Sequence, residues 1–242
     1  MALLRKDAWF GSVPPELEGA VLALASPKRL QHGEHLFSRG DPPDGLYAVL
    51  EGGLRISGVT EAGKEAILAI VEPPGWFGEI ALFDRLPRTH NVMAEGATRV
   101  MHIPLRGLDA LLAQSPHFWH QFGVLMALKL RLAFIGMEDL ALLPAESRLA
   151  RRLLMLARSS PAADGQGPVT LSLSQSQLGM MLSLSRQTTN QVLQSLQDQG
   201  VVQVSYGRIE VLDLDKLVSV AGLSPSERHI LEHLKQGGRN AP

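Results

Sequence analysis

One stretch of the chain gathers side chains that suit a phosphorylated ligand. Residues 75–92 read Gly-Trp-Phe-Gly-Glu-Ile-Ala-Leu-Phe-Asp-Arg-Leu-Pro-Arg-Thr-His-Asn-Val. Arg88 offers a planar fork of donors that matches phosphate oxygens, and Thr89 adds a hydroxyl beside it. Glu79 only accepts hydrogen bonds when ionised and suits a sugar hydroxyl, while Gly78 lets the backbone approach a ligand closely. Together these residues predict a pocket for a small anionic nucleotide.

The same residues also have a purely structural interpretation. Arg88 and Glu79 carry opposite charges and could form a buried ion pair at the corner of a barrel. Local chemistry does not separate this pair from a ligand pocket, so both interpretations stay open at this stage.

A second stretch carries the side chains of a DNA-reading helix. Ser174 is suited to cap a short helix that ends at Leu182, and Ser185 is suited to cap a second helix over residues 186–197. Two short helices joined by such a tight turn are typical of a helix-turn-helix. Arginine and amide side chains near the start of the second helix can pair with base edges in the major groove. The residues predicted to contact DNA are Ser185, Arg186, Gln187, Thr189, Asn190 and Gln191.

A wing is predicted directly after this helix. Residues 201–212 alternate in polarity around Tyr206-Gly207-Arg208, which indicates two strands joined by a tight turn. Arg208 at the tip is placed to contact DNA phosphates. Basic and acidic residues are nearly equal in number over residues 143–222. We therefore expect weak DNA binding by one copy and useful affinity only from a dimer.

The anion-binding stretch needs a rigid scaffold, and the residues around it predict one. From residue 28 to about 104, short runs with β character alternate with glycine-containing turns. Many short strands at near-regular spacing indicate a small antiparallel barrel or roll. Before them, residues 7–26 read as short helices, one of which begins at Pro14-Pro15.

A long helix is predicted to connect the two functional stretches. Helical periodicity begins at Leu105 and dominates residues 117–142. One apolar row has the alternating spacing of a coiled-coil seam and consists of Met126, Leu130, Ala133, Met137 and Leu140. A second row consists of Phe118, Phe122, Leu125, Leu132 and Ile135. Since two apolar faces need two partners, we expect the barrel to cover one and a second copy of the helix to cover the other. Burial of the helix inside a monomer is the alternative.

Composition narrows the class of protein. The 242 residues are 45% hydrophobic, which is ordinary for a globular chain of one large or two small domains. The net charge of -1 gives no overall basic field. The sequence has no cysteine, which excludes disulfides, thiolate metal sites and a cysteine nucleophile and fits a cytoplasmic protein. We expect no signal peptide, membrane span or metal site, and the lack of hydrolase, nucleotide P-loop or zinc-protease motifs argues against an enzyme.

Over residues 10–220 the chain resembles the CRP/FNR family of bacterial transcription regulators. The resemblance is carried by Phe77-Gly78-Glu79, by Pro87-Arg88-Thr89 and by Leu184-Ser-Arg-Gln-Thr-Thr-Asn-Gln-Val-Leu. It implies an α+β fold with an N-terminal antiparallel, jelly-roll-like β-roll of the cyclic-nucleotide-binding type over residues 1–116. A dimerisation helix over residues 117–142 and a winged helix-turn-helix domain over residues 143–222 would follow. It also implies a homodimer that binds a pseudo-palindromic promoter site on double-stranded DNA and contacts RNA polymerase.

Only part of the family's effector site has matching residues in this chain. In members that bind cyclic AMP, a Gly-Glu pair binds ribose and an Arg-Ser/Thr pair binds the cyclic phosphate. The matching residues here are Gly78, Glu79, Arg88 and Thr89. His90 replaces the usual small residue that follows. The hydroxyl residues that contact adenine fall, without gaps, at Ala133 and Phe134, whose side chains cannot form those hydrogen bonds.

The effector therefore has three interpretations. The first is a cyclic mononucleotide or cyclic dinucleotide. The second is haem, because many histidines lie in the first half of the chain, namely His32, His35, His90, His102, His117 and His120. The third is a regulator without an effector. An iron–sulfur cluster of the FNR type is excluded by the lack of cysteine. A cyclic-nucleotide module that does not bind DNA is disfavoured by the helix-turn-helix.

The DNA-reading helix departs from the cyclic-AMP receptor. Arg186 matches the family's base-reading arginine, whereas Gln187 and Gln191 replace an acidic and a basic residue. The resemblance therefore implies a different target sequence.

The chain continues past the usual end of the family. After a closing helix at residues 213–221, residues 223–242 predict an extra amphipathic helix that begins at a cap formed by Ser224 and Glu227. The last five residues are expected to be disordered. Packing on the DNA-binding domain is the default expectation for this extension.

Overall fold

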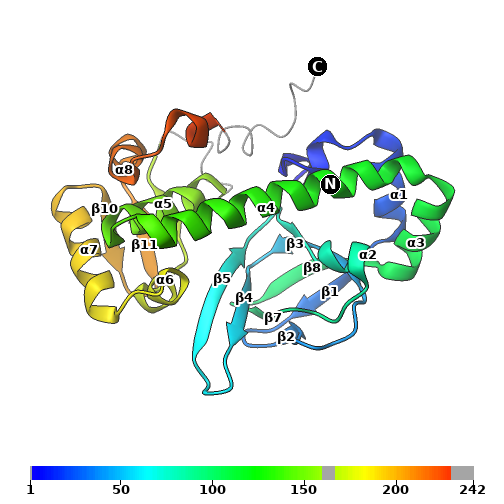
Figure 1. The fold of residues 1–242 in the computed structure, drawn as a ribbon, viewed down its shortest axis with the longest axis horizontal. Helices are drawn as coiled ribbons and strands as arrows, with labels where there is room; N and C mark the ends of the chain where they lie inside the picture. The colour runs from blue at the N-terminus through cyan, green and yellow to red at the C-terminus, as the bar shows by residue number, and fades with distance from the viewer. Residues whose placement is uncertain (1, 160–166, 230–242) are drawn as a thin grey trace. The chain divides into compact units, whose positions relative to one another are not determined.

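The computed structural model describes residues 2–159 and 167–229. The chain forms two compact units, and a long helix runs from the first into the second (Figure 1). The first unit holds residues up to Lys64 together with residues 68–132. The second holds the described residues from Ala133 to His229, and it also includes residues 65–67.

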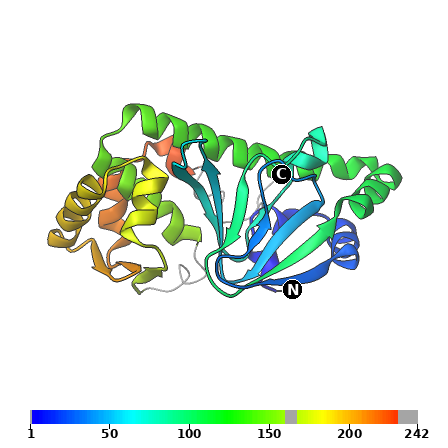
Figure 2. The same ribbon diagram turned by 90° about the horizontal axis from the view of Figure 1, so that it is seen from below.

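Antiparallel strands dominate the first unit, as the alternating pattern predicts (Figure 2). One sheet has the strand order β1-β8-β3-β6, and the other has the order β2-β7-β4-β5. The bounds of the first sheet are β1 (Ser26–Leu30), β8 (Thr98–Pro104), β3 (Gly45–Glu51) and β6 (Trp76–Phe77). Those of the second are β2 (His35–Phe37), β7 (Asn91–Ala94), β4 (Leu54–Val59) and β5 (Glu65–Val71).

Short helices surround these sheets. They are η1 (Leu4–Lys6), η2 (Phe10–Ser12), α1 (Pro15–Leu24), α2 (Ile80–Asp84), α3 (Leu105–Gln114) and η3 (Pro116–Phe118). Proline occupies the first turn of α1, where its missing N–H costs no hydrogen bond, and this confirms the predicted helix start.

Strand β3 explains how the first unit packs, because it is buried on both faces. Its side chains alternate, as the pleat of a strand requires. Leu46 and Ala48 join a core that includes Trp9, Phe10 and residues of α1 and α3. Tyr47 and Val49 face the other way, into a core shared with residues of the second sheet such as Leu54 and Val92. The two sheets therefore enclose one core, and helices close the outer face of the first sheet.

The long helix α4 (Trp119–Leu142) has the two faces that its sequence predicts. Phe118, Phe122 and Leu125, from the second apolar row, are buried in the core with Trp9, whereas Leu132 and Ile135 of the same row are only partly buried. The coiled-coil row stays largely uncovered within one chain, since Leu130, Ala133, Met137 and Leu140 are exposed and Met126 is partly exposed.

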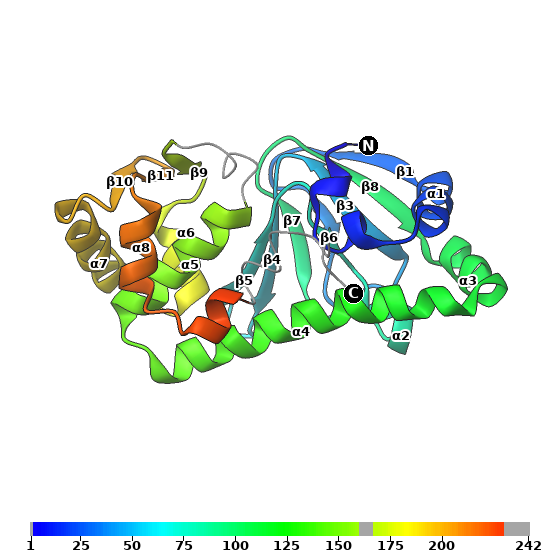
Figure 3. The ribbon, with the colours of Figure 1, turned by 90° about the horizontal axis from the view of Figure 1, so that it is seen from above.

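The second unit contains a winged helix-turn-helix (Figure 3). Its helices are α5 (Ala145–Ser159), α6 (Gln175–Leu182), α7 (Arg186–Asp198) and α8 (Leu214–Ala221). Its strands β9 (Val169–Leu171), β10 (Val202–Ser205) and β11 (Arg208–Val211) form an antiparallel sheet in the order β10-β11-β9. The predicted two-stranded wing is thus extended by β9, which is too short to give a periodicity signal.

The predicted helix caps of this unit are formed. The Ser174 hydroxyl accepts a hydrogen bond from the Gln177 backbone N–H, and the Gln177 side chain reciprocates in a capping box. The Ser185 hydroxyl accepts from the Thr188 backbone N–H at the start of α7. These caps fix where each helix begins and so set the position of α7 relative to α6.

The predicted cap of the C-terminal extension is also present. Ser224 N–H donates to Glu227 Oε2 at 2.7 Å, and Glu227 N–H donates to the Ser224 hydroxyl at 3.2 Å. Most of the predicted loop at residues 159–168, the remainder of the extension helix and the last five residues lie outside the described residues. No helix in the described ranges is both long enough and apolar enough to cross a membrane.

Candidate functional site

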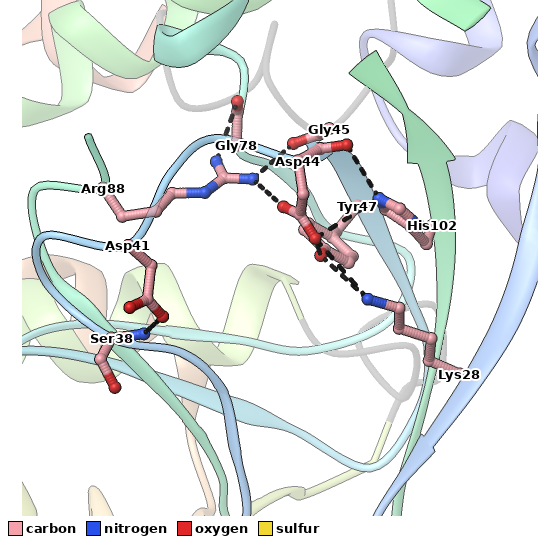
Figure 4. Close-up of polar contacts among 9 residues, drawn as sticks. All are labelled: Lys28, Ser38, Asp41, Asp44, Gly45, Tyr47, Gly78, Arg88 and His102. Atoms are coloured by element: carbon pink, nitrogen blue, oxygen red, sulfur yellow. Dashed lines mark hydrogen bonds and ion pairs between the residues drawn. The ribbon is translucent and has the colours of Figure 1, made fainter. Parts of the chain in front are cut away.

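Arg88 lies buried in the first unit, and its guanidinium is already bound by the protein (Figure 4). Its Nη2 donates to Asp44 Oδ1 and to the Gly45 carbonyl oxygen, both at 2.7 Å. Its Nη1 is 3.4 Å from the Gly78 carbonyl oxygen. The guanidinium also lies over the Phe37 ring, with its central carbon 4.3 Å from the ring centroid. The predicted phosphate-binding arginine is thus held rigidly in place.

Asp44 is the centre of the polar cluster that holds Arg88 (Figure 4). It also accepts a hydrogen bond from the Tyr47 hydroxyl, and Lys28 Nζ and His102 Nε2 each lie 3.6 Å from its Oδ2. Burial works to raise the pKa of Asp44, but the hydrogen bonds from Tyr47 and Arg88 outweigh it and hold the pKa below the ordinary value. Asp44 is therefore ionised at neutral pH and neutralises the positive charge of Arg88.

Glu79 is also buried and has its own partner. Lys129 of α4 donates from Nζ to Glu79 Oε2 at 2.8 Å and also to the Trp76 carbonyl oxygen. The ion pair between Arg88 and Glu79 that the sequence left open is therefore wrong as a structural interpretation, since each residue pairs elsewhere. Among the described residues, Asp44 and Lys129 hold the site, and sequence reasoning missed both. The sequence did contain a signal that Lys129 has a partner, because it is a charged residue on a strongly apolar helix, one turn before Ala133.

Gly78 is required by the packing of Arg88. It has a φ of +96°, and an added Cβ would lie 2.9 Å from the Gly45 carbonyl oxygen and 3.1 Å from Arg88 Nη1. A side chain here would clash with backbone that cannot move away. The glycine therefore allows Arg88 to lie against the backbone of β3.

Thr89 and His90 form the outer edge of the site. Thr89 is exposed, and its Oγ1 is 2.9 Å from His90 Nδ1. Arg39 Nε donates to the Thr89 carbonyl oxygen at 2.8 Å. Burial, and then the charge of Arg39, hold the pKa of His90 below its ordinary value. An anion bound here would offset the charge of Arg39 and so favour the protonated form of the His90 imidazole.

The predicted adenine-side residues belong to a different unit from this cluster. Ala133 and Phe134 are exposed on α4 and fall in the second unit, whereas Gly78, Glu79 and Arg88 belong to the first. The α4 residue that does contact the site is Lys129.

The histidines do not form a cluster in the part of the chain that the structure describes. His102 stacks on Tyr47, and His117 packs against Phe118. No group of three metal-binding side chains comes together among the described residues.

Most of the α7 residues predicted to contact DNA lie on one exposed face of the helix. Ser185, Arg186, Gln187, Asn190 and Gln191 are all exposed. Gln194, one turn later, is also exposed and extends this polar face, although its side chain bonds to Asp198. The arrangement gives one helix face lined by arginine and amides, the groups that read guanine and adenine in a major groove.

Thr189 was assigned to this face incorrectly. Its side chain is fully buried, and its hydroxyl donates to the Ser185 carbonyl oxygen at 2.9 Å. A Cβ added to Gly179 of α6 would lie 3.0 Å from the Thr189 hydroxyl. Thr189 therefore packs α7 against α6, and Gly179 makes room for that contact.

The tip of the wing is the other exposed polar element. Arg208 is exposed at the start of β11, and Tyr206 in the turn before it is fully exposed. Gly207 has a φ of +67°, a left-handed conformation that glycine adopts without steric cost in the turn. The wing thus presents an aromatic ring and a guanidinium on a short rigid hairpin.

These elements define a class of protein: a β-roll of the cyclic-nucleotide-binding type joined by a long helix to a winged helix-turn-helix. The cyclic nucleotide-binding domain family matches residues 27–115, and the Crp-like helix-turn-helix domain family matches residues 147–220. The chain belongs to the CRP/FNR family of transcription regulators.

Individual relatives agree with this assignment. The transcriptional regulator SdrP of Thermus thermophilus is 32% identical over 74% of this chain and 85% of its own. The CRP-like cAMP-activated global transcriptional regulator of Mycobacterium tuberculosis is 26% identical over 89% of this chain and 96% of its own. A solved CRP/FNR-family regulator, also from Thermus thermophilus, has 28% identity and a TM-score of 0.67 over 82% of this chain and 99% of that one.

Proposed function

We propose that this transcription regulator acts as a homodimer whose two α7 helices read a pseudo-palindromic DNA site. The observation that carries the proposal is the apolar row on α4. Leu130 and Met137 of this row are 52% and 64% exposed, and Leu140 is 46% exposed. An uncovered row with coiled-coil spacing is most simply covered by the same row of a second copy.

Dimerisation also supplies the affinity that one domain lacks. The second unit presents few basic side chains on its DNA-reading elements, mainly Arg186 and Arg208. Two copies on one duplex double the phosphate and base contacts and match a two-fold symmetric site. We propose that the bound dimer contacts RNA polymerase, as expected of a regulator that acts at promoters in the cytoplasm.

Selection from random-sequence duplex DNA tests the DNA-reading proposal. The full-length chain should enrich a site with two inverted halves, and Arg186→Ala should reduce the enrichment. Arg29→Ala, which removes an exposed arginine from β1 in the first unit, is the matched control and should enrich the same site. Failure of the wild-type chain to enrich any sequence would overturn the proposal.

We also propose that a small anion, with a cyclic nucleotide as the first candidate, binds at Arg88 and controls DNA affinity. Among the described residues, Arg88 Nε is buried without a hydrogen-bond partner. The residue that follows Arg88 is Thr89, which is exposed and carries a hydroxyl. A bound anion would accept hydrogen bonds from Nε and from the second hydrogen of Nη1, because both hydrogens of Nη2 are already donated to Asp44 and Gly45.

The existing partners of Arg88 and Glu79 favour a competing function, a regulator without an effector. Both charged groups are neutralised within the protein, so the site is stable with no ligand. Calorimetry separates the two functions. Cyclic AMP, cyclic GMP and cyclic di-GMP are titrated into wild type and Arg88→Ala. Saturable heat that Arg88→Ala abolishes supports effector control, and no heat with any of the three supports the regulator without an effector.

A further inference from the structure

Arg151 of α5 joins separate segments of the second unit at one point. Its Nη1 donates to Asp139 Oδ1 of α4 at 2.6 Å and to Glu227 Oε1 of the C-terminal extension at 2.5 Å. Its Nε donates to the Ala221 carbonyl oxygen at 2.9 Å, and its Nη2 donates to the Gly222 carbonyl oxygen at 3.1 Å. A second Nη2 contact reaches Glu227 Oε2 at 3.4 Å.

This arrangement uses the whole guanidinium. Arginine has five N–H hydrogens, and among the described residues Arg151 makes five contacts. Arg151 and Asp139 are both buried. Since a buried guanidinium is stable only when its donors and its charge are satisfied, the extension provides part of what keeps Arg151 in place.

The two carboxylates around Arg151 are not equivalent. Burial raises the pKa of Asp139, and the charge of Glu227 adds to that rise while Arg151 opposes it. Glu227 is pre-positioned by its own helix cap with Ser224, and hydrogen bonds from Ser224 and Arg151 outweigh burial to lower its pKa. Glu227 therefore supplies the more firmly ionised partner of the guanidinium.

The residues bonded to Arg151 lie at the ends of two helices and in the segments that follow them. Asp139 lies in the last turn of α4, Arg151 lies in α5, and the connection between these helices turns at Leu143 and Pro144. Ala221 and Gly222 form the end of α8, the last helix of the winged domain. The hydrogen bonds of Arg151 therefore connect the last turn of α4, helix α5 and the end of α8 within the second unit.

We propose that residues 223–229, the described part of the C-terminal extension, form an intramolecular strap, in which Glu227 completes the partners of Arg151 and so locks the winged domain onto the end of α4. In a dimer, the angle between α4 and the winged domain sets the separation of the two α7 helices. The effect of the strap on DNA binding thus rests on the proposed function, whereas the lock itself does not.

Hydrogen–deuterium exchange of the full-length chain without DNA tests the lock. Glu227→Gln keeps the size of the side chain and removes its charge. It should speed exchange about threefold to tenfold at the end of α4 and the following turn, residues 139–145, with α7 unchanged. Asp215→Asn, the same chemical change at an exposed position on α8, is the matched control and should leave residues 139–145 unchanged. Faster exchange confined to residues 223–229 would overturn the proposal.

A double-mutant cycle gives a second readout that does not depend on exchange. If Asp139 and Glu227 act through one guanidinium, the effects of Asp139→Asn and Glu227→Gln on the urea midpoint should not add. Additive effects would show that the two contacts are independent and would contradict the strap. DNA affinity for the selected site should fall about threefold to tenfold in Glu227→Gln. Absence of DNA binding by the wild type would instead count against the proposed function and leave the exchange result valid.

Discussion

Arg88 and Asp44 form a hydrogen-bonded ion pair, with 2.7 Å between Nη2 and Oδ1, at the place where the sequence predicts a phosphate site. The side chain of Arg88 is 5% exposed, and that of Asp44 is 43% exposed. The pair therefore lies at the border between the core and solvent. The protein has therefore already oriented Arg88 for an anion, but Asp44 already neutralises its charge.

Neutralising Asp44 should strengthen anion binding. Asp44→Asn keeps an oxygen that can accept from Arg88 but removes the competing negative charge. We expect cyclic nucleotide affinity to increase about threefold to tenfold, because the nearby charge acts across a partly solvated site. Calorimetry on wild type and variant measures this. Asp41→Asn, a nearby acid that accepts from the Ser38 N–H, is the control and should leave affinity unchanged. Weaker binding in Asp44→Asn would show that Asp44 mainly positions Arg88.

Effector binding should strengthen as the pH falls, through His90. The pKa of His90 is lowered in the free protein by burial and by Arg39. A bound anion beside it favours the protonated imidazole, so the pKa is higher in the complex than in the free protein. Affinity then rises as the pH falls from above neutral through the ordinary histidine range, and it levels off only below the lowered pKa of the free protein. Titrations across this range measure the effect, and His90→Gln should flatten the profile. An unchanged slope in His90→Gln would assign the proton to another group.

The pair of Lys129 and Glu79 should contribute to stability through α4. Lys129→Met leaves the buried Glu79 carboxylate without its partner. We expect the free energy of unfolding to fall by about 1–3 kcal/mol, less than for a fully buried pair because Lys129 is partly exposed. Urea unfolding measures this. The double variant with Glu79→Gln should recover part of the loss, and a double variant less stable than Lys129→Met would contradict the pairing.

Thr189 and Asn190 are neighbours on α7 with opposite expected roles. Thr189→Val keeps the shape but loses the hydrogen bond to Ser185, so the free energy of unfolding should fall by about 0.5–1.5 kcal/mol. DNA affinity of the folded protein should hold. Asn190→Ala should leave stability within about 0.5 kcal/mol and weaken binding to the selected site by about tenfold. Thermal unfolding and fluorescence anisotropy measure the two properties. A loss of DNA affinity in Thr189→Val at unchanged stability would return Thr189 to the DNA-reading face.

The sequence predicted features that depend on local periodicity and capping. The spacing of Leu130, Met137 and Leu140 placed them on one side of a helix, and the structure leaves that side exposed. Ser174 and Ser185 marked the starts of two helices because serine caps act within three residues. Thr189 was predicted wrongly even though a local signal existed. It precedes Leu193 by four residues and Leu196 by seven, so all three lie on the inward face of α7.

The polar partners in the site could not be predicted in the same way. Asp44 and Arg88 are far apart in the sequence, and Lys129 is further still from Glu79. Such pairs depend on how strands and helices pack, and Asp44 stands in a Pro-Pro-Asp-Gly run whose composition indicates only a turn. Arg151 is one of several basic residues on α5, and its contacts join segments that local patterns do not connect.

Native mass spectrometry of the full-length chain with the selected DNA duplex tests most directly whether two copies read one site. We predict a complex of two chains per duplex for the wild type. Met137→Asp places a charge in the exposed apolar row of α4 and should abolish this complex and the free dimer, whereas Arg131→Asp, one position outside that row, should preserve both. A single chain bound with full affinity to the selected duplex, or a Met137→Asp variant that still binds in pairs, would contradict the dimeric DNA-reading regulator.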